Sequence, residues 1–220
     1  MRNDLEKRST NAERGNKAYL SLPQAMIGES RMFDYQSLFD EYCMENGLDL
    51  ALSFDMPAGY ETANGTFDVG SKTVFINADL LNDAPDHEKA YYLFHELRHA
   101  MQYLCPERFG DILKLSLRYV IMYDGTCCKL IGGEYIECKL DGGEEYYTDL
   151  YLGQPYEVDA NTFAYERARE LYGDSEALLK LYEFWLPRRP VSDETYRSVY
   201  SELDRKTQFL SDLVASRSPD

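Results

Sequence analysis

Apolar side chains recur at intervals of three and four residues in several stretches of the chain, as they do on the buried face of a helix. Three of these stretches are followed by residues that stop helices, namely Gly47, the pair Cys105-Pro106, and Gly173. The pattern predicts helices over residues 33–46, 86–104, 157 to about 172, 175–186 and 192–215.

Extended chain is predicted between the first two helices. Residues 48–54 have strand character, and residues 60–77 predict a hairpin that turns at 70–72 and returns as 73–76. Residues 107–154 alternate apolar runs with glycine pairs, which predicts a helix followed by a small antiparallel sheet. The predicted fold class is therefore α+β.

One domain is expected. The first 17 residues are polar and charged without periodicity, which predicts a flexible N-terminal arm. Residues 18–215 are long enough to bury one sizeable hydrophobic core.

The acidic composition limits the classes of partner that we expect. The formal net charge of −16 repels phosphate backbones and anionic lipids, so neither nucleic acid nor a membrane is an expected partner. The chain has no apolar run long enough to span a membrane, and its start lacks the apolar core of a signal peptide. Its five cysteines form no CxxC pair. We therefore expect a cytoplasmic protein with reduced thiols.

Two of the three histidines lie four residues apart in the helix predicted over 86–104. On a helical wheel, the apolar side of that helix carries Ala90, Leu93, Phe94, Leu97, Ala100, Met101 and Leu104. The opposite side carries Glu88, Tyr92, His95, Glu96, His99 and Gln102. Histidines one turn apart can direct ring nitrogens at one point, as a tetrahedral zinc site requires. The alternative is a helix with exposed histidines and no metal.

The stretch His95-Glu96-Leu97-Arg98-His99 is an HExxH motif and resembles the metal helix of the zincin metallopeptidases. The resemblance implies a zincin-like fold and one zinc ion per chain, with His95 and His99 as ligands. Glu96 would be the general base that accepts a proton from the zinc-activated water during hydrolysis of a peptide bond. Arg98 is expected to pair with a surface carboxylate.

A third metal ligand must come from outside this helix, because His87 lies two turns before His95. The stretch PYEVDANTFAYERA, residues 155–168, resembles the second helix of the gluzincin type and, more narrowly, of the ImmA/IrrE-like peptidases. The resemblance implies that Glu157 is the third ligand and that Asn161 accepts a hydrogen bond from a ligand histidine.

Several alternatives for this second helix stay open. Ala160, Ala164 and Ala168 share a side with Glu157, which would let two helices approach closely but also suits an ordinary packed helix. Asp159, Glu144 and Glu145 are alternative ligands. The sequence also departs from many gluzincins, which have Asp at the position of Asn161. Relative to that pattern, residues 107–154 form an insertion that would cover the cleft and set specificity.

Two further roles follow from the resemblance. In zincins a strand at a sheet edge binds extended substrate, and Val74, Phe75 and Ile76 are the candidates for it, with a buried core strand as the alternative. Tyr156 and Tyr165 are candidate donors to the oxyanion because they lie nearest Glu157 in the sequence.

The leading hypothesis is a zinc-dependent metalloendopeptidase, with no cofactor beyond the metal ion. Its substrate would be a peptide or protein, and the negative charge favours a basic one through electrostatic steering. The alternatives are a zincin-fold binding or regulatory protein with weak catalysis, and a zinc hydrolase of a small amide. An open groove beside the substrate strand would favour the peptidase.

Overall fold

The computed structural model describes residues 33–215, with side chains up to residue 208. The arm predicted for residues 1–17 lies outside the described residues. Two three-stranded sheets and several helices make up the described chain, so the predicted α+β class is confirmed. No helix in this part of the chain is both long and apolar enough to cross a membrane.

The first sheet, sheet A, is mixed. It follows α2 (Tyr35–Asn46) and consists of β1 (Ala51–Ser53), β2 (Gly65–Asp68) and β3 (Thr73–Ile76). The strand order is β1-β3-β2, with β1 parallel and β2 antiparallel to β3. The predicted first helix and the hairpin are confirmed, whereas the strand predicted over 48–54 is shorter.

The middle position of β3 corrects one prediction. Main-chain pairing occupies both sides of β3, and the side chains of Val74 and Ile76 are fully buried. Val74, Phe75 and Ile76 therefore do not form a sheet edge, and the alternative of a core strand holds. The edge strands are β1 and β2, each of which pairs only with β3 among the described residues, and β2 is the one that contacts α3.

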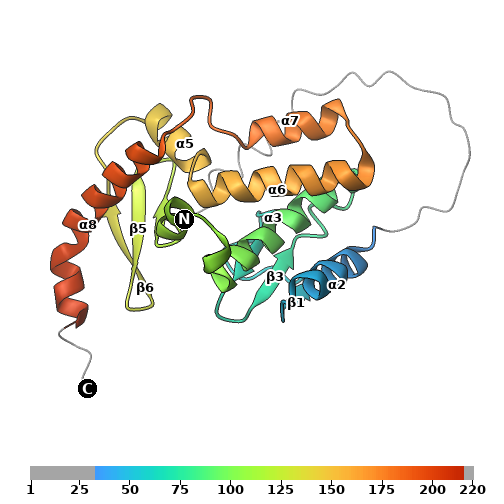
Figure 1. The fold of residues 1–220 in the computed structure, drawn as a ribbon, viewed down its shortest axis with the longest axis horizontal. Coiled ribbons are helices and arrows are strands. Elements are labelled where there is room, and N and C mark those ends of the chain that lie inside the picture. Colours follow the sequence, from blue (N-terminus) through green and yellow to red (C-terminus); the bar gives the residue numbers. More distant parts are fainter. Residues whose placement is uncertain (1–32, 216–220) are drawn as a thin grey trace, which may run out of the picture.

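The helix that carries the two histidines packs against elements on both of its sides. It is α3 (Asp86–Leu104), and its bounds agree with those predicted from the sequence. One side packs on sheet A and α2 through fully buried residues such as Leu93 and Leu97. The opposite side is not exposed, because α6 lies along it and α7 covers α6 (Figure 1).

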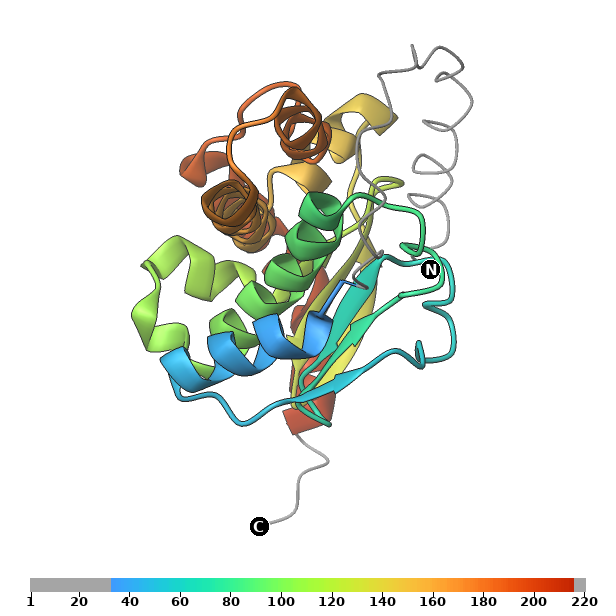
Figure 2. The same ribbon diagram turned by 90° about the vertical axis from the view of Figure 1, so that its right-hand side faces the viewer.

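The helix that carries Glu157 packs closely against α3. It is α6 (Pro155–Tyr172), and α7 (Glu176–Phe184) follows it. Ala160, Ala164 and Ala168 are fully buried, so small side chains line the contact and bring the two backbones together. Figure 2, which looks along the molecule, shows the helices stacked on one face of sheet A.

The predicted helix and antiparallel sheet of residues 107–154 are also present. After the short helices η2 (Pro106–Arg108) and α4 (Asp111–Ser116), the strands β4, β5 and β6 form sheet B in sequence order. The bounds of these strands and of the next helix are β4 Tyr119–Ile121, β5 Thr126–Ile131, β6 Glu134–Lys139 and α5 Glu144–Leu152.

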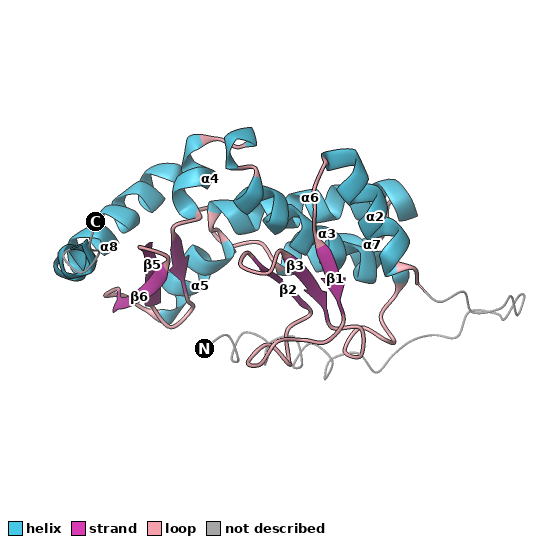
Figure 3. Cartoon of the chain, turned by 90° about the horizontal axis from the view of Figure 1, so that it is seen from below, coloured by secondary structure: helices cyan, strands magenta, loops and turns pink. Residues whose placement is uncertain are grey.

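The C-terminal helix packs on one face of sheet B. This helix, α8 (Asp193–Ala215), lies beside β5 and β6, away from sheet A (Figures 1 and 3). The rings of Tyr119 and Tyr200 stack with centroids 4.3 Å apart, and Lys129 Nζ lies 2.6 Å from the Asp204 carboxylate. Sheet B and α8 therefore share a second core.

Candidate metal site

Three side chains from two helices converge on one point. His95 and His99 lie one turn apart on α3, and Glu157 lies in the first turn of α6. The two Nε2 atoms are 3.0 Å apart, and each lies 3.5 Å from Oε2 of Glu157. The exposed fractions of the three side chains are only 12–15%. Among the described residues, this is the one group of such side chains close enough to hold a metal ion.

The spacing and chemistry of these atoms fit a zinc ion. In a tetrahedral site with bonds of about 2 Å, neighbouring ligand atoms lie about 3.3 Å apart. Two ring nitrogens that face each other at 3.0 Å need a shared proton or a cation between them. The buried Glu157 carboxylate adds a negative charge that a cation would neutralise. Two imidazoles and one carboxylate form a donor set that leaves a fourth position for water or substrate.

Burial and charge act in opposite directions on this group in the metal-free protein. Burial alone would lower the pKa of His99, but the adjacent Glu157 carboxylate raises it to about 9. Burial would likewise raise the pKa of Glu157, yet the two histidines hold it well below its usual range. Protonation of the histidines and binding of a metal ion must therefore compete.

Gln102 fixes the orientation of His99. Its Oε1 lies 2.9 Å from Nδ1 of His99, and its Nε2 donates to the Tyr156 carbonyl and to the Asp159 carboxylate, both at 2.8 Å. Because both partners of Nε2 are acceptors, the atom that faces His99 must be the amide oxygen. Nδ1 of His99 therefore carries the proton, which leaves the Nε2 lone pair for a metal.

An ion pair extends this network between the two helices. Arg98 donates from Nε and Nη2 to the two carboxylate oxygens of Asp159, at 2.7 and 3.0 Å. The guanidinium also lies 4.7 Å from the ring centroids of Phe109 and Phe163. Arg98 pairs with a carboxylate, as predicted, but with a part-buried one rather than one on the surface. Asp159 bonds to Arg98 and Gln102 and not to the metal position.

Asn161 has a different partner from the one implied by the resemblance. Its Oδ1 accepts a hydrogen bond from the Tyr91 hydroxyl at 3.0 Å, and its Nδ2 donates to the Trp185 carbonyl at 3.4 Å. The expected bond from a ligand histidine is absent. Nδ1 of His99 bonds to Gln102 instead, and Nδ1 of His95 is buried without a hydrogen-bond partner. Asn161 instead ties α3 to α6 and to the end of α7.

Of the remaining candidate residues, only Tyr156 lies near the histidines. Glu144 and Glu145 are exposed at the start of α5 and do not join the histidines. Tyr165 stacks on Tyr182 with ring centroids 4.6 Å apart, so the structure does not bring it to the site. Tyr156 is buried, and its ring centroid lies 5.8 Å from that of His99.

Glu96 lies between the histidines and the edge strand. Its side chain is 7% exposed and packs against Gly65 at the start of β2. A Cβ atom at Gly65 would lie 2.8 Å from Cγ of Glu96 and 3.0 Å from the Phe75 carbonyl oxygen. Glycine is therefore required there for β2 to approach the metal helix this closely.

A cleft of about 750 Å³ opens from this group. His95, His99, Glu96 and Glu157 line it, together with Tyr156. Residues 65–70 of the β2–β3 hairpin also line it, as do residues of sheet B, which comes next to sheet A in Figure 3. Part of the segment 107–154 therefore lines the cleft. That it also covers the cleft and sets specificity stays a prediction.

Replacing Gln102 by leucine should weaken zinc binding by about 10- to 100-fold, because His99 loses the partner that fixes its tautomer. The loss of two further hydrogen bonds should also lower the free energy of unfolding by about 1–3 kcal/mol. Metal affinity can be measured by competition with a chromophoric chelator, and stability by urea unfolding. Gln154→Leu is the matched control, since Gln154 is also fully buried but bonds to the main chain of Ile121. Equal effects of both variants on zinc affinity would contradict the role of Gln102.

Comparison of the chain with models of protein families, with curated proteins and with solved structures finds no match. The His95, His99 and Glu157 triad is consistent with the HxxxH…E arrangement of a zincin-like site.

Proposed function

We propose that this protein is a zinc-dependent peptidase. The observation that carries the proposal is the convergence of His95, His99 and Glu157 in a cleft that Glu96 also lines. A bound zinc ion would polarise a substrate carbonyl and lower the pKa of a water molecule. Both effects serve hydrolysis of an amide bond.

The chain's own residues have distinct roles in this proposal. Glu96 accepts the proton of the attacking water and hands it to the leaving amine, because it is the non-ligand carboxylate that adjoins the ligand histidine His95 on α3. The other one, Asp68, bonds to Ser71 in the hairpin turn. Gln102 fixes the orientation of His99, and its bond to Asp159 and the Arg98–Asp159 ion pair connect α3 to α6. Tyr156, whose ring packs near His99 in the cleft, is the candidate donor to the oxyanion.

The shape of the cleft favours a peptide over a small amide. The edge strand β2 lines it from Gly65 to Asp68, and the side of β2 away from β3 has no partner strand among the described residues. An extended peptide can bond to such an edge through its main chain. The intact Glu96 supports an enzyme over a binding protein, since binding alone needs no general base.

Metal-dependent hydrolysis tests the proposal directly. Zinc-loaded protein should release new amino termini from unfolded casein, and a chelator should stop the reaction until zinc is restored. Hydrolysis of small amides without cleavage of any peptide would favour the small-amide hydrolase. Zinc binding with neither activity would favour a regulatory binding protein.

Replacing Gly65 by alanine should slow hydrolysis by about tenfold or more with zinc still bound. The added methyl group must displace the Glu96 side chain or push β2 away from α3, and small errors in position are costly in catalysis. Rates and zinc content should be measured together. Gly70→Ala in the same hairpin is the control, because the nearest atom to its Cβ position lies 3.6 Å away. Full activity in Gly65→Ala would show that this contact does not position Glu96.

A further inference from the structure

The two faces of sheet B differ in what covers them. Side chains alternate along a strand, and in β5 Cys127 and Lys129 are buried on the side of α8. Leu130, on the opposite face, lines the cleft and lies across from Tyr135 in β6. Together with Cys128 and Val120 these side chains form the apolar face, defined here as Val120, Cys128, Leu130 and Tyr135, all of which line the cleft.

The apolar face is accessible from solvent at the mouth of the cleft. Tyr135 is 49% exposed, and Val69, in the turn of the hairpin that also lines the cleft, is 45% exposed. Exposed apolar side chains that line one groove mark a site where an apolar partner binds. The apolar face and the metal triad belong to one continuous cleft, so a single ligand can contact both.

Apart from the two ligand histidines, the titratable carboxyl and basic side chains that line the cleft are all acidic. Asp68, Glu96 and Glu157 line it, and none of the described lining residues is a lysine or an arginine. Metal ligation accounts for Glu157, but Asp68 and Glu96 remain as negative charges near any bound chain. Away from the metal position, an acidic substrate side chain would be repelled and would find no lysine or arginine in the cleft to pair with.

We propose that the apolar face selects the substrate. The preferred substrate is a peptide that places a large aromatic or aliphatic side chain on Leu130 and Tyr135 and carries no acidic residue beside it. This inference rests on the proposed peptidase function. An extended peptide along β2 points alternate side chains to opposite sides, so one set of them faces sheet B across the cleft. Leu130 and Tyr135 are then residues that determine specificity rather than catalytic residues.

Binding to the zinc-loaded Glu96→Gln protein tests the inference without turnover. The probes are short blocked peptides of alanine and serine that carry Phe, Ala or Glu at one central position. Trp185 is the only tryptophan and lines the cleft, so its fluorescence can report binding, with calorimetry as an independent readout. The Phe peptide should bind about tenfold or more tightly than the Ala peptide, and the Glu peptide most weakly.

Two variants connect this preference to the apolar face. Tyr135→Ala, at an exposed position where the fold tolerates change, should reduce the preference for Phe severalfold, and Leu130→Asp should abolish it. Leu171→Asp is the matched control, because Leu171 is 47% exposed on α6 and does not line the cleft. The control should retain the full preference.

The results separate this inference from the proposed function. Equal binding of the Phe and Ala peptides, no binding of any peptide, or a preference that survives both variants overturns the inference, even if the wild type cleaves peptides. A preference that depends on Leu130 and Tyr135 supports it. If that preference is found but zinc-loaded wild type cleaves nothing, the selective cleft stands and the peptidase function fails.

Discussion

Replacing Glu96 by glutamine is expected to reduce peptide hydrolysis by about 10²- to 10⁴-fold while zinc binding is retained. Glutamine has nearly the same size, so it keeps the contact with Gly65, but it cannot accept a proton from water. The variant should therefore lose kcat rather than the affinity for peptide. Zinc content, peptide affinity and initial rates must be measured on the same preparation.

The matched control for this change lies on the same helix. Glu88 precedes Glu96 by two turns of α3 and does not line the cleft, so Glu88→Gln should keep full activity. Wild-type rates in a zinc-loaded Glu96→Gln protein would remove Glu96 from the reaction. A parallel loss of zinc would instead identify Glu96 as a ligand.

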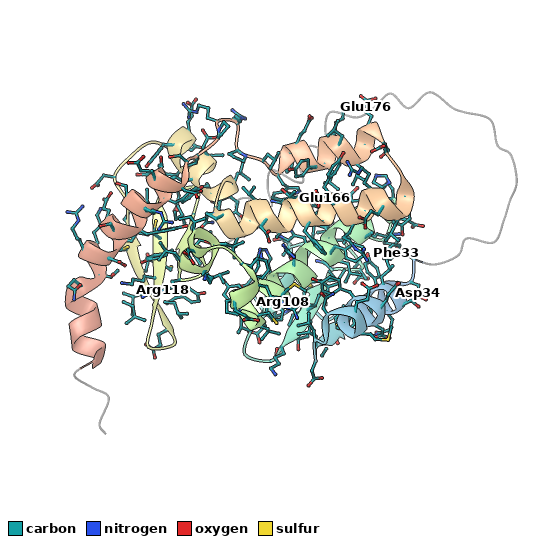
Figure 4. All side chains as sticks on the ribbon, in the orientation of Figure 1. Phe33, Asp34, Arg108, Arg118, Glu166 and Glu176 are labelled. Carbon is teal, nitrogen blue, oxygen red and sulfur yellow. The ribbon has the colours of Figure 1, made fainter. Side chains whose placement is uncertain are left out.

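Replacing Glu157 by alanine is expected to weaken zinc binding by more than the 10- to 100-fold typical of a residue that only supports a ligand. The change removes the anionic member of the triad and leaves two neutral imidazoles. Affinity should be measured by competition with a chromophoric chelator at neutral pH. Glu166→Ala is the control, because Glu166 is exposed on the same helix (Figure 4).

The metal-free proteins provide a second readout of the same contact. The Glu157 carboxylate raises the pKa of His99 to about 9 against the effect of burial, so His99 is protonated at pH 7 in the wild type. Without that carboxylate the pKa of His99 should fall, because burial opposes the charge and only Glu96 and Gln102 still favour it, so more of the ring should be neutral at pH 7 in Glu157→Ala. Nitrogen NMR shifts of the ring distinguish the two states. Identical titration of His99 in both proteins would contradict its contact with Glu157.

Local sequence patterns predicted the parts of the site that depend on one helix at a time. The spacing of His95 and His99 and the stop at Cys105-Pro106 determine α3 directly. The alanines that share a side with Glu157 predicted a close helix contact, and all three are fully buried against α3 or its neighbours. These inferences needed only the helical repeat and residue size.

The pairing of strands that are far apart in the sequence could not be predicted from such local patterns. The hairpin of β2 and β3 was predicted, but the parallel pairing of β1 with β3 joins segments about 20 residues apart and puts β3 in the middle, with β1 and β2 at the edges. A four-residue strand such as Thr73–Ile76 has the same apolar pattern in the middle of a sheet as at its edge.

The side-chain partners of the site were the hardest to predict. Asn161 and Gln102 are both polar residues able to bond to a histidine, and only the packed helices show that Asn161 turns to Tyr91 while Gln102 reaches His99. One sequence signal for Gln102 was present: it lies three residues after His99 on the polar side of the wheel, within reach of that ring. The contribution of sheet B to the cleft required the tertiary fold.

The zinc content of untagged protein is the most direct test of the metal site. The protein should be purified without added metal, titrated with zinc at neutral pH, passed through a desalting column and examined by elemental analysis. We expect about one zinc ion per chain, held by His95, His99 and Glu157. A protein that is folded and yet retains no zinc after this treatment would contradict the metal site, and with it the proposed peptidase.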